Sequence, residues 1–321
     1  MKDFLKIWYI APQRLCNFHC SYCVSRGDYS KSNKINWKNP KDIEGFKKIV
    51  NWISKRPFKI GLRLGSLGEP FTSCDFLDQV AWLTNQKNIQ FVELLTNGSL
   101  LKQGLQKLQK KGAKFEKLSL WVSYHPSQIA LDRFIDNARF AQEIYKCFVV
   151  VNGIIFPNNI EYIKNLKKAT DKYDLRFNLD LGYNPDIPST CNNVFDIGKS
   201  IPILQHYPDL KSLISLGVNE KILQINITAM KKPKGQLCSA GQNYICITIN
   251  GDVYPCSRYV VLKYNKLGNI LKNANAIQFK SERWKQCIVK SGCCNKEDFL
   301  NLKLVEGYIN KKTPSLGWHE K

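Results

Sequence analysis

The stretch "LCNFHCSYC" (residues 15–23) contains three cysteines, Cys16, Cys20 and Cys23, separated by three residues and then by two. It comes shortly after the apolar run "FLKIWYIA" (4–11), which predicts a buried strand. Closed iron–sulfur sites and structural zinc sites normally use four protein ligands, so this loop has one thiol fewer than such a site requires. Three thiolates can instead hold three irons of a cubic 4Fe–4S cluster and leave the fourth iron open to a ligand from outside the protein.

Zinc and disulfides are the alternative uses of these cysteines. A zinc site usually includes a histidine, but the position of His19 between two cysteines is better explained by packing. The twelve cysteines of the chain come without a secretory signal, because residues 1–10 mix charges with a short apolar run and no cleavage site follows. We therefore expect reduced thiols, a cytoplasmic location and metal ligation rather than disulfides. No run of about 18 apolar residues occurs, so we expect no membrane span.

The formal net charge of +22 suggests an anionic partner such as nucleic acid. The basic residues are spread along the chain, and their densest groups are short, as in "KKGAK" (110–114) and "KKPK" (231–234). Arginine, the better planar reader of phosphate groups, supplies only nine of the 48 basic residues. We expect mainly a solvated basic surface, with an anionic substrate or RNA as the alternative.

Short apolar runs alternate with amphipathic stretches from residue 4 to about residue 182. The predicted strands are 4–11, 60–70, 89–99, 117–126, 146–156 and 175–182. The predicted helices are 40–56, 74–86, 100–112, 128–144 and 158–173. This alternation implies an α/β fold with parallel strands and right-handed crossovers, which an open doubly wound sheet and a barrel both satisfy.

Polar motifs follow four of these predicted strands. The cysteines follow the first strand, "GSLGEP" (65–70) the second, "LLTNGS" (94–99) the third and "SYHP" (123–126) the fourth. In barrels the functional groups lie at the carboxyl ends of the strands. The motifs therefore predict one site on one rim of the fold.

"CNFHCSYC" resembles the Cys-x3-Cys-x2-Cys signature of the radical S-adenosylmethionine (radical SAM) superfamily, with the usual aromatic residue, Tyr22, before the last cysteine. The resemblance covers roughly residues 4–182 and implies a partial (β/α)6 TIM-like barrel. "GSLGEP" is similar to the Gly-Gly-Glu-Pro motif that meets the methionine amino group of SAM, although serine and leucine precede Gly68 here.

The resemblance also implies the cofactors and the residues that bind them. A 4Fe–4S cluster on the three cysteines would bind SAM through its open iron, and one electron would cleave the sulfonium bond to give a 5′-deoxyadenosyl radical that abstracts a hydrogen atom from the substrate. The candidate SAM-binding residues are Tyr22, Gly68, Glu69, Pro70, Asn97, Ser123 and His125. Ser123 lies where family members contact the ribose, and His125 beside it is a candidate contact for cofactor or substrate.

The C-terminal part contains a second set of cysteines. "CSAGQNYICITINGDVYPCSRY" (238–259) predicts two strands around an Asn-Gly turn and resembles the opening of SPASM and twitch domains, which hold auxiliary 4Fe–4S clusters. A full SPASM domain needs about seven ligands, whereas the candidates here are Cys238, Cys256, Cys287, Cys293 and Cys294. The shorter twitch form with one cluster on four of these five is therefore expected, and reduced or zinc-binding cysteines are the alternative.

The remaining cysteines are expected to be small buried side chains for the most part, Cys147 and Cys246 above all because they lie in apolar strands. Cys191 is different, since it lies in a polar stretch. It is the candidate catalytic residue, as a hydrogen-atom donor to a substrate radical, if it is exposed.

We expect three parts, namely a radical SAM core (1–182), a bridge (183–231) and an auxiliary cluster domain (232–321). The expected reaction is oxidation or epimerisation of a small molecule such as a sugar or aminocyclitol, which could be anionic, with an electron donor such as flavodoxin or ferredoxin. A maturase of ribosomal peptides is the alternative, although strand one begins too early for an N-terminal leader-binding domain. The sequence is also compatible with an RNA-modifying enzyme and with an iron–sulfur protein that only transfers electrons.

Overall fold

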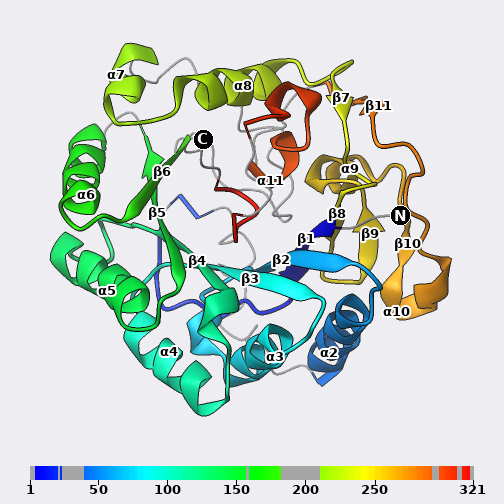
Figure 1. Cartoon of the computed structure of the whole chain (residues 1–321), viewed down its shortest axis with the longest axis horizontal. Helices are drawn as coiled ribbons and strands as arrows, with labels where there is room; N and C mark the ends of the chain where they lie inside the picture. Colours follow the sequence, from blue (N-terminus) through cyan, green and yellow to red (C-terminus); the bar gives the residue numbers. More distant parts are fainter. Residues whose placement is uncertain are drawn as a thin grey trace.

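The computed structural model describes residues 4–20, 22–23, 40–156, 159–181, 210–290, 296–308 and 313–318. Its first half is a repeated β/α unit (Figure 1). The strands are β1 (Phe4–Ala11), β2 (Lys59–Ser66), β3 (Ile89–Thr96), β4 (Leu118–Ser123), β5 (Phe148–Ile155) and β6 (Arg176–Leu181). The helices that alternate with them are α2 (Pro40–Ser54), α3 (Cys74–Thr84), α4 (Leu101–Lys110), α5 (Leu131–Glu143) and α6 (Ile160–Lys172).

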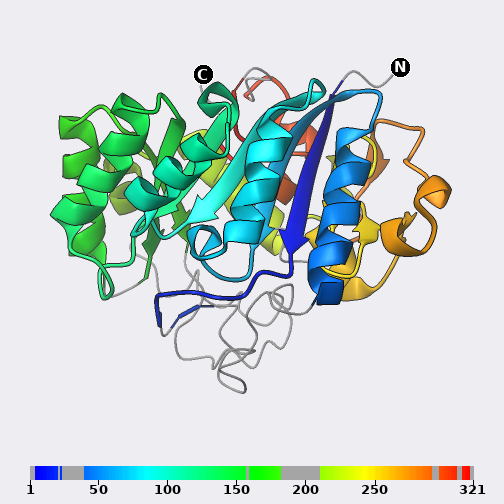
Figure 2. The ribbon, with the colours of Figure 1, turned by 90° about the horizontal axis from the view of Figure 1, so that it is seen from below.

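Strands β1 to β6 are parallel, and each pairs with the next in sequence. Figure 1 shows them as an arc with the helices on its outer side, and the arc does not close. The predicted α/β fold, a partial TIM-like barrel, is therefore confirmed. Figure 2 shows the segment after β1 lying across the carboxyl ends of the strands, where the motifs predict the site.

The main hydrophobic core lies between the outer face of the sheet and the helices. Leu5, Ile7 and Tyr9 alternate along β1 and are fully buried there. Tyr9 stacks on Phe46 of α2 with ring centroids 5.9 Å apart. Phe46, Ile49, Val50 and Ile53 of α2 pack against this core.

The C-terminal part continues the same sheet. Its larger elements are α7 (Leu210–Ser215), α8 (Glu220–Lys231), β7 (Leu237–Cys238), β8 (Tyr244–Ile247), β9 (Asp252–Tyr254), α9 (Ser257–Leu262), β10 (Gly268–Asn269), α10 (Ile270–Asn273), β11 (Lys285–Gln286) and α11 (Lys296–Phe299). The described residues also include the single-turn 3₁₀ segments η1 (Pro70–Thr72), η2 (Phe115–Lys117), η5 (Ala274–Ala276) and η6 (Lys303–Val305). β8 and β9 form the predicted antiparallel hairpin, and β8 also pairs in parallel with β1. With β10, which pairs with β9, the hairpin extends the barrel sheet to nine strands among the described residues. Gly251 in the turn has φ +78°, which favours glycine.

The inner face of the sheet carries several buried polar side chains. Arg63 on β2 and Glu93 on β3 are both buried and form an ion pair of 2.6 Å. The segment 313–318 reaches this pair, because the amide of Leu316 donates to Glu93 at 3.3 Å. Figure 1 shows α11 and the C-terminal segment within the arc of strands. Among the described residues no helix is both long and apolar enough to cross a membrane.

Candidate active site and auxiliary cysteine pocket

The loops after β1 and β2 are joined by backbone hydrogen bonds. The amides of Leu67 and Gly68 donate to the carbonyl of Gln13 at 2.8 and 3.2 Å, and the amide of Glu69 donates to the carbonyl of Leu15 at 2.9 Å. A Cβ on Gly68 would lie 2.3 Å from that Leu15 oxygen, so only glycine fits here. The cysteine loop therefore begins from a fixed position on the rim.

The Gln13 side chain adds hydrogen bonds between the same two loops. It is fully buried, and its Nε2 donates to the Glu69 carbonyl at 3.1 Å and to Thr72 Oγ1 at 2.8 Å. Pro70 begins the short 3₁₀ turn η1 here, where proline lacks only an amide that would have no helical partner. Neither Gln13 nor Thr72 was singled out from the sequence.

The Glu69 carboxylate is buried and turned toward the end of β3. It accepts hydrogen bonds from Thr96 Oγ1 and the Asn97 amide, each at 2.7 Å, and from the Phe71 amide at 3.3 Å. Burial raises the pKa of Glu69 to about 7, although the three hydrogen-bond donors act in the opposite direction and lower that pKa. The donors that hydrogen-bond the Glu69 carboxylate are groups of the protein itself. A contact between Glu69 and the SAM amino group therefore stays a prediction.

Asn97 links the end of β3 to the first cysteine. Its Nδ2 donates to Asn17 Oδ1 at 3.0 Å and lies 4.0 Å from the Cys16 sulfur. Its Oδ1 accepts from the Ser99 hydroxyl at 2.6 Å, and Asn17 Nδ2 donates to that hydroxyl at 2.9 Å. These bonds fix where the Cys16 thiol lies relative to the rim.

Tyr22 and His125 hold the other end of the cysteine loop. The Tyr22 hydroxyl lies 2.8 Å from His125 Nδ1, and the two rings stack with centroids 5.8 Å apart. Tyr22 also contacts the ring of Phe156, just after β5, at 4.8 Å. Burial lowers the pKa of His125 to about 4, so this histidine is neutral at pH 7 and suited to a hydrogen bond rather than an ion pair.

The three thiols on this loop differ in exposure. Cys20 is buried, whereas Cys16 and Cys23 are partly exposed. Burial, mainly, raises the pKa of Cys16, and the nearby Glu69 and Cys23 raise it further. Within the described part of the chain no three metal-binding side chains converge closely enough to hold a single metal ion. Three thiols on one loop suit three irons of a 4Fe–4S cluster whose fourth iron stays open.

A row of hydrogen-bonding side chains crosses strands β4 to β6 on the inner face. Ser123, Asn152 and Asn178 are lateral neighbours in the sheet. Asn152 Nδ2 donates to Ser123 Oγ at 3.3 Å, and Asn178 Nδ2 donates to Asn152 Oδ1 at 2.6 Å. Lys296 of α11 donates to Asn178 Oδ1 and forms an ion pair with Asp180 at 3.2 Å. The row presents polar groups beside the predicted SAM site.

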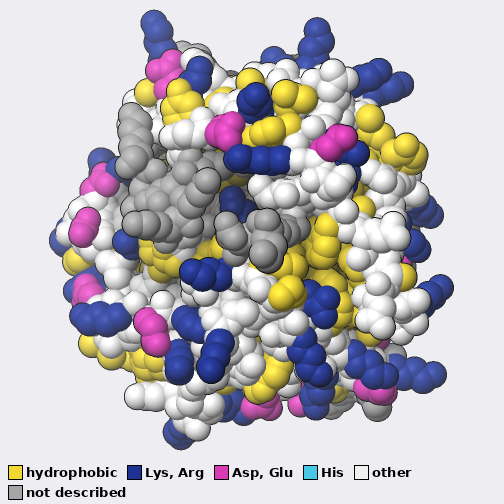
Figure 3. All heavy atoms as spheres, turned by 45° about the vertical axis from the view of Figure 1, so that its right-hand side comes forward, with side chains coloured by type: hydrophobic (Ala, Val, Ile, Leu, Met, Phe, Trp, Pro, Cys, Tyr) yellow, Lys and Arg dark blue, Asp and Glu magenta, His cyan; other side chains and the backbone are white. Residues whose placement is uncertain are grey.

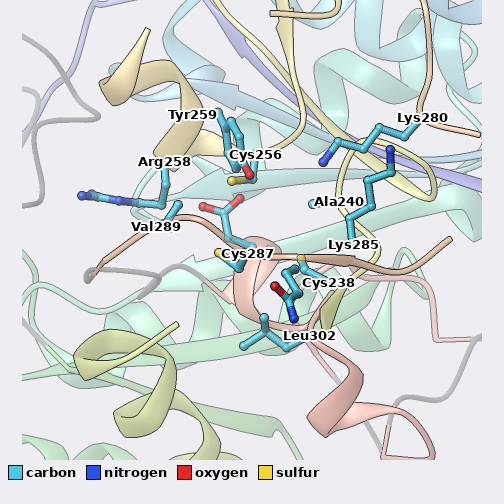
Figure 4. A pocket seen from close by; sticks show the side chains of 12 residues that line it. Cys238, Ala240, Cys256, Arg258, Tyr259, Lys280, Lys285, Cys287, Val289 and Leu302 are labelled. Atoms are coloured by element: carbon cyan, nitrogen blue, oxygen red, sulfur yellow. The ribbon is translucent and has the colours of Figure 1, made fainter. Parts of the chain in front are cut away.

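The C-terminal cysteines line a separate pocket. Cys238 on β7, Cys256 before α9 and Cys287 after β11 surround it, as Figure 4 shows. β7 and β11 pair so that Lys285 lies opposite Cys238. The hairpin, the β7–β11 ribbon and α11 thus bring together cysteines that are far apart in sequence.

The pocket thiols are strongly desolvated. Burial raises the pKa of Cys238 to about 12, that of Cys256 well above its ordinary value, and that of Cys287 more moderately. Asp298 beside them raises the pKa of these thiols further. Neutral buried thiols are costly to ionise, so iron bound there would have to offset part of the charge of the thiolates that hold it. The donor set fits an iron–sulfur cluster.

Comparisons with known proteins agree with both halves of this description. Residues 238–311 match the SPASM family, described as an iron–sulfur cluster-binding domain. SuiB of Streptococcus suis, in a crystal structure bound to S-adenosylmethionine, superposes with a TM-score of 0.57 and 16% identity over 88% of this chain and 67% of SuiB. The C-terminal part of the chain therefore matches a SPASM domain, and the chain as a whole has the fold of this SAM-binding structure.

Two further proteins are similar to this chain. A structure of anSMEcpe with AdoMet and the Cp18Cys peptide matches with a TM-score of 0.50 and 18% identity, over 87% of this chain and 81% of that one. The GTP 3′,8-cyclase of Campylobacter lari is 30% identical over 118 residues. That match spans 37% of this chain and about a third, 34%, of the cyclase.

The SPASM match supports the predicted iron–sulfur chemistry of the C-terminal part, and SuiB, which has a similar fold, binds S-adenosylmethionine. The residues that would hold SAM and the clusters stay predictions. Of the predicted site residues, Cys191, Cys293 and Cys294 lie outside the described residues. Cys147 and Cys246 are buried as expected, whereas Cys74 is exposed.

Sequence reasoning missed the polar inner face and the pocket-lining cations. A single polar residue inside an otherwise apolar strand, such as Glu93 in "IQFVELLT" or Asn152 in "FVVVNGII", was the available signal for the inner face. Lys280 and Lys285 at the auxiliary pocket had no comparable signal, because lysine is common throughout the chain.

Proposed function

We propose that this chain is a radical SAM enzyme that holds a 4Fe–4S cluster on Cys16, Cys20 and Cys23 and binds SAM at the open iron. When bound, the cluster and SAM supply one-electron cleavage of the sulfonium C–S bond and the hydrogen-atom abstraction that follows it. The observation that carries the proposal is the fixed position of the three-thiol loop at the carboxyl ends of β1 to β5. An electron donor such as flavodoxin or ferredoxin would reduce the cluster.

The residues around the loop have separable tasks in this proposal. Asn97 and Gln13 fix the loop, and Tyr22 with His125 covers its outer end. Ser123 and the asparagine row behind it offer donors and acceptors to the hydroxyl groups of SAM or substrate.

For the substrate, we propose a small polar molecule, such as a sugar or aminocyclitol, that is oxidised or epimerised. The polar side chains on the inner face of the barrel support a hydroxyl-rich substrate, since they supply amide and charged groups beside the ring of Trp121. In an oxidation, the auxiliary cluster would accept the second electron from the substrate radical.

A peptide substrate is the second candidate. A specific observation favours it: the solved structures with similar folds include SuiB bound to precursor peptide SuiA and anSMEcpe with the Cp18Cys peptide. The name of the Campylobacter lari relative, GTP 3′,8-cyclase, points instead to a small molecule. The two candidates differ in what must enter the barrel beside the asparagine row.

The test is formation of 5′-deoxyadenosine from SAM by the reconstituted, reduced chain under anaerobic conditions, measured by liquid chromatography and mass spectrometry. Cys16→Ala should reduce this product by at least about a thousandfold, since a lost ligand removes the cluster. Cys74→Ala, which changes an exposed cysteine outside both sites, is the matched control and should match the parent. The proposal fails if the iron-loaded parent forms no 5′-deoxyadenosine, or if Cys16→Ala matches Cys74→Ala.

A further inference from the structure

Lys280 extends toward the auxiliary cysteine pocket from the loop before β11. Its amide donates to the carbonyl of Gly241 at 2.9 Å. Gly241 has φ +93°, and a Cβ there would lie 2.8 Å from Lys280 Cδ, so the lysine stem occupies the space that glycine leaves. In Figure 4 the ammonium end of Lys280 is directed toward the cysteines. The path of this side chain into the pocket is therefore built by the local backbone.

The ammonium of Lys280 acts electrostatically on the thiols. It interacts with Cys238, Cys256 and Cys287, and it lies 5.4 Å from the centre of the Tyr259 ring. Within the described ranges no carboxylate forms an ion pair with it. A half-buried cation that faces three thiols, the proposed cluster ligands, and has no carboxylate paired with it in the described ranges favours a negatively charged occupant.

Lys285 provides a contrast within the same pocket. It lies opposite Cys238 across the β7–β11 pair, but its ammonium is 3.5 Å from the carboxylate of Glu282 and turns away from the cysteines (Figure 4). The acidic group facing the pocket is Asp298, which accepts hydrogen bonds from the Tyr244 hydroxyl at 2.9 Å and from Ser257. Of the two lysines, only Lys280 points its charge at the thiols.

We propose that Lys280 tunes the auxiliary cluster, its ammonium stabilising the reduced, more negative form and so raising the reduction potential. This inference rests on the proposed auxiliary cluster but not on SAM cleavage. One-electron reduction adds one negative charge to a cluster held by thiolates, and a nearby fixed cation offsets that charge in a medium of low dielectric. A higher potential suits a cluster that takes an electron from a substrate radical.

The experiment measures the midpoint potential of the auxiliary cluster alone. A full-length chain with Cys16, Cys20 and Cys23 changed to alanine removes the other cluster, and a dithionite titration is followed by electron paramagnetic resonance. Lys280→Gln should be about tenfold harder to reduce, about 59 mV lower for one electron. Lys285→Gln, the matched control, should stay near the parent, and Lys280→Arg, which keeps the charge, should do the same.

Each outcome decides the proposal. Equal potentials for Lys280→Gln and Lys285→Gln would overturn it, as would equal shifts in Lys280→Gln and Lys280→Arg. If Lys280→Gln takes up no iron while Lys280→Arg does, the charge serves to hold the anionic cluster and the assignment of Lys280 to it stands. If neither variant takes up iron, or the triple-alanine parent itself holds none, Lys280 has no tuning role. Because SAM is absent from this titration, its result is independent of 5′-deoxyadenosine formation.

Discussion

Gly68 lies where the loops after β1 and β2 meet, and its missing side chain allows them to touch. The motif "GSLGEP" suggested a role for this residue in binding SAM, whereas the structure gives it a steric reason, since a Cβ would meet the backbone of Arg14 and Leu15. Glu69, next to it, is similarly tied to β3 by buried hydrogen bonds. Gly68 and Glu69, which the sequence predicts to bind SAM, therefore also join the loops at the rim.

Glu69 makes the free energy of unfolding depend on pH, and the Glu69→Gln variant should lack this dependence. Burial raises the pKa of Glu69 from 4.5 to about 7, so the folded chain binds this proton more tightly than the unfolded chain. The resulting contribution is present below about pH 4.5 and is lost as pH rises through about 7. Relative to Glu69→Gln, the parent should therefore lose up to about 3 kcal/mol of unfolding free energy between pH 5 and pH 8.

Urea unfolding of both chains across this pH range measures the difference. A difference that stays constant from pH 5 to pH 8 would show that Glu69 is ionised in the folded chain throughout.

Helix α11 connects the two halves of the molecule through three consecutive buried charges. Lys296 bonds to β6, Glu297 pairs with Arg63 of β2, and Asp298 accepts hydrogen bonds from the β8 side of the auxiliary pocket. The sequence "KEDF" (296–299) would ordinarily indicate a solvated turn. It gives no local signal that all three charged side chains are buried against partners from distant segments. Burial of this kind depends on contacts between distant segments, which local pattern does not contain.

Pairing between distant strands is likewise not predictable from local sequence patterns. The six parallel strands and the hairpin were predictable, because their hydrophobic periods and the Asn-Gly turn are local signals. The parallel pairing of β8 with β1 was not predicted, since it joins segments more than 200 residues apart. The cysteine loop was predictable from its spacing, while the geometry of the auxiliary pocket depends on this long-range pairing.

Removing the Glu297 carboxylate should destabilise the chain, because it leaves the buried Arg63 with Glu93 as its remaining described ion-pair partner. We expect Glu297→Ala to lower the unfolding free energy by about 3 kcal/mol, near the lower end for a broken buried pair. Glu161→Ala, which breaks an exposed pair with Lys164, should cost less than about 1 kcal/mol. Urea denaturation followed by circular dichroism gives both values, and equal small effects would mean that the Arg63–Glu297 contact adds no stability.

At the scale of the whole molecule, the two sets of cysteines belong to different environments on one continuous sheet. Cys16, Cys20 and Cys23 lie in a loop on the rim, whereas Cys238, Cys256 and Cys287 line a pocket beside the hairpin. Lysines are spread over the face of the molecule in Figure 3 rather than gathered into one stripe, which fits a solvated basic surface better than a nucleic-acid groove. The first set suits a reactive, open cluster and the second a closed one.

The most direct test of this division is the response of each cluster to SAM in the electron paramagnetic resonance spectrum of the reduced chain. We predict that SAM changes the signal in the parent and in a Cys238→Ala/Cys256→Ala variant, and causes no change in a Cys16→Ala/Cys20→Ala/Cys23→Ala variant. If SAM instead alters the spectrum of the variant that lacks the three loop cysteines, the open coordination position does not lie on residues 15–23 and the central claim is wrong.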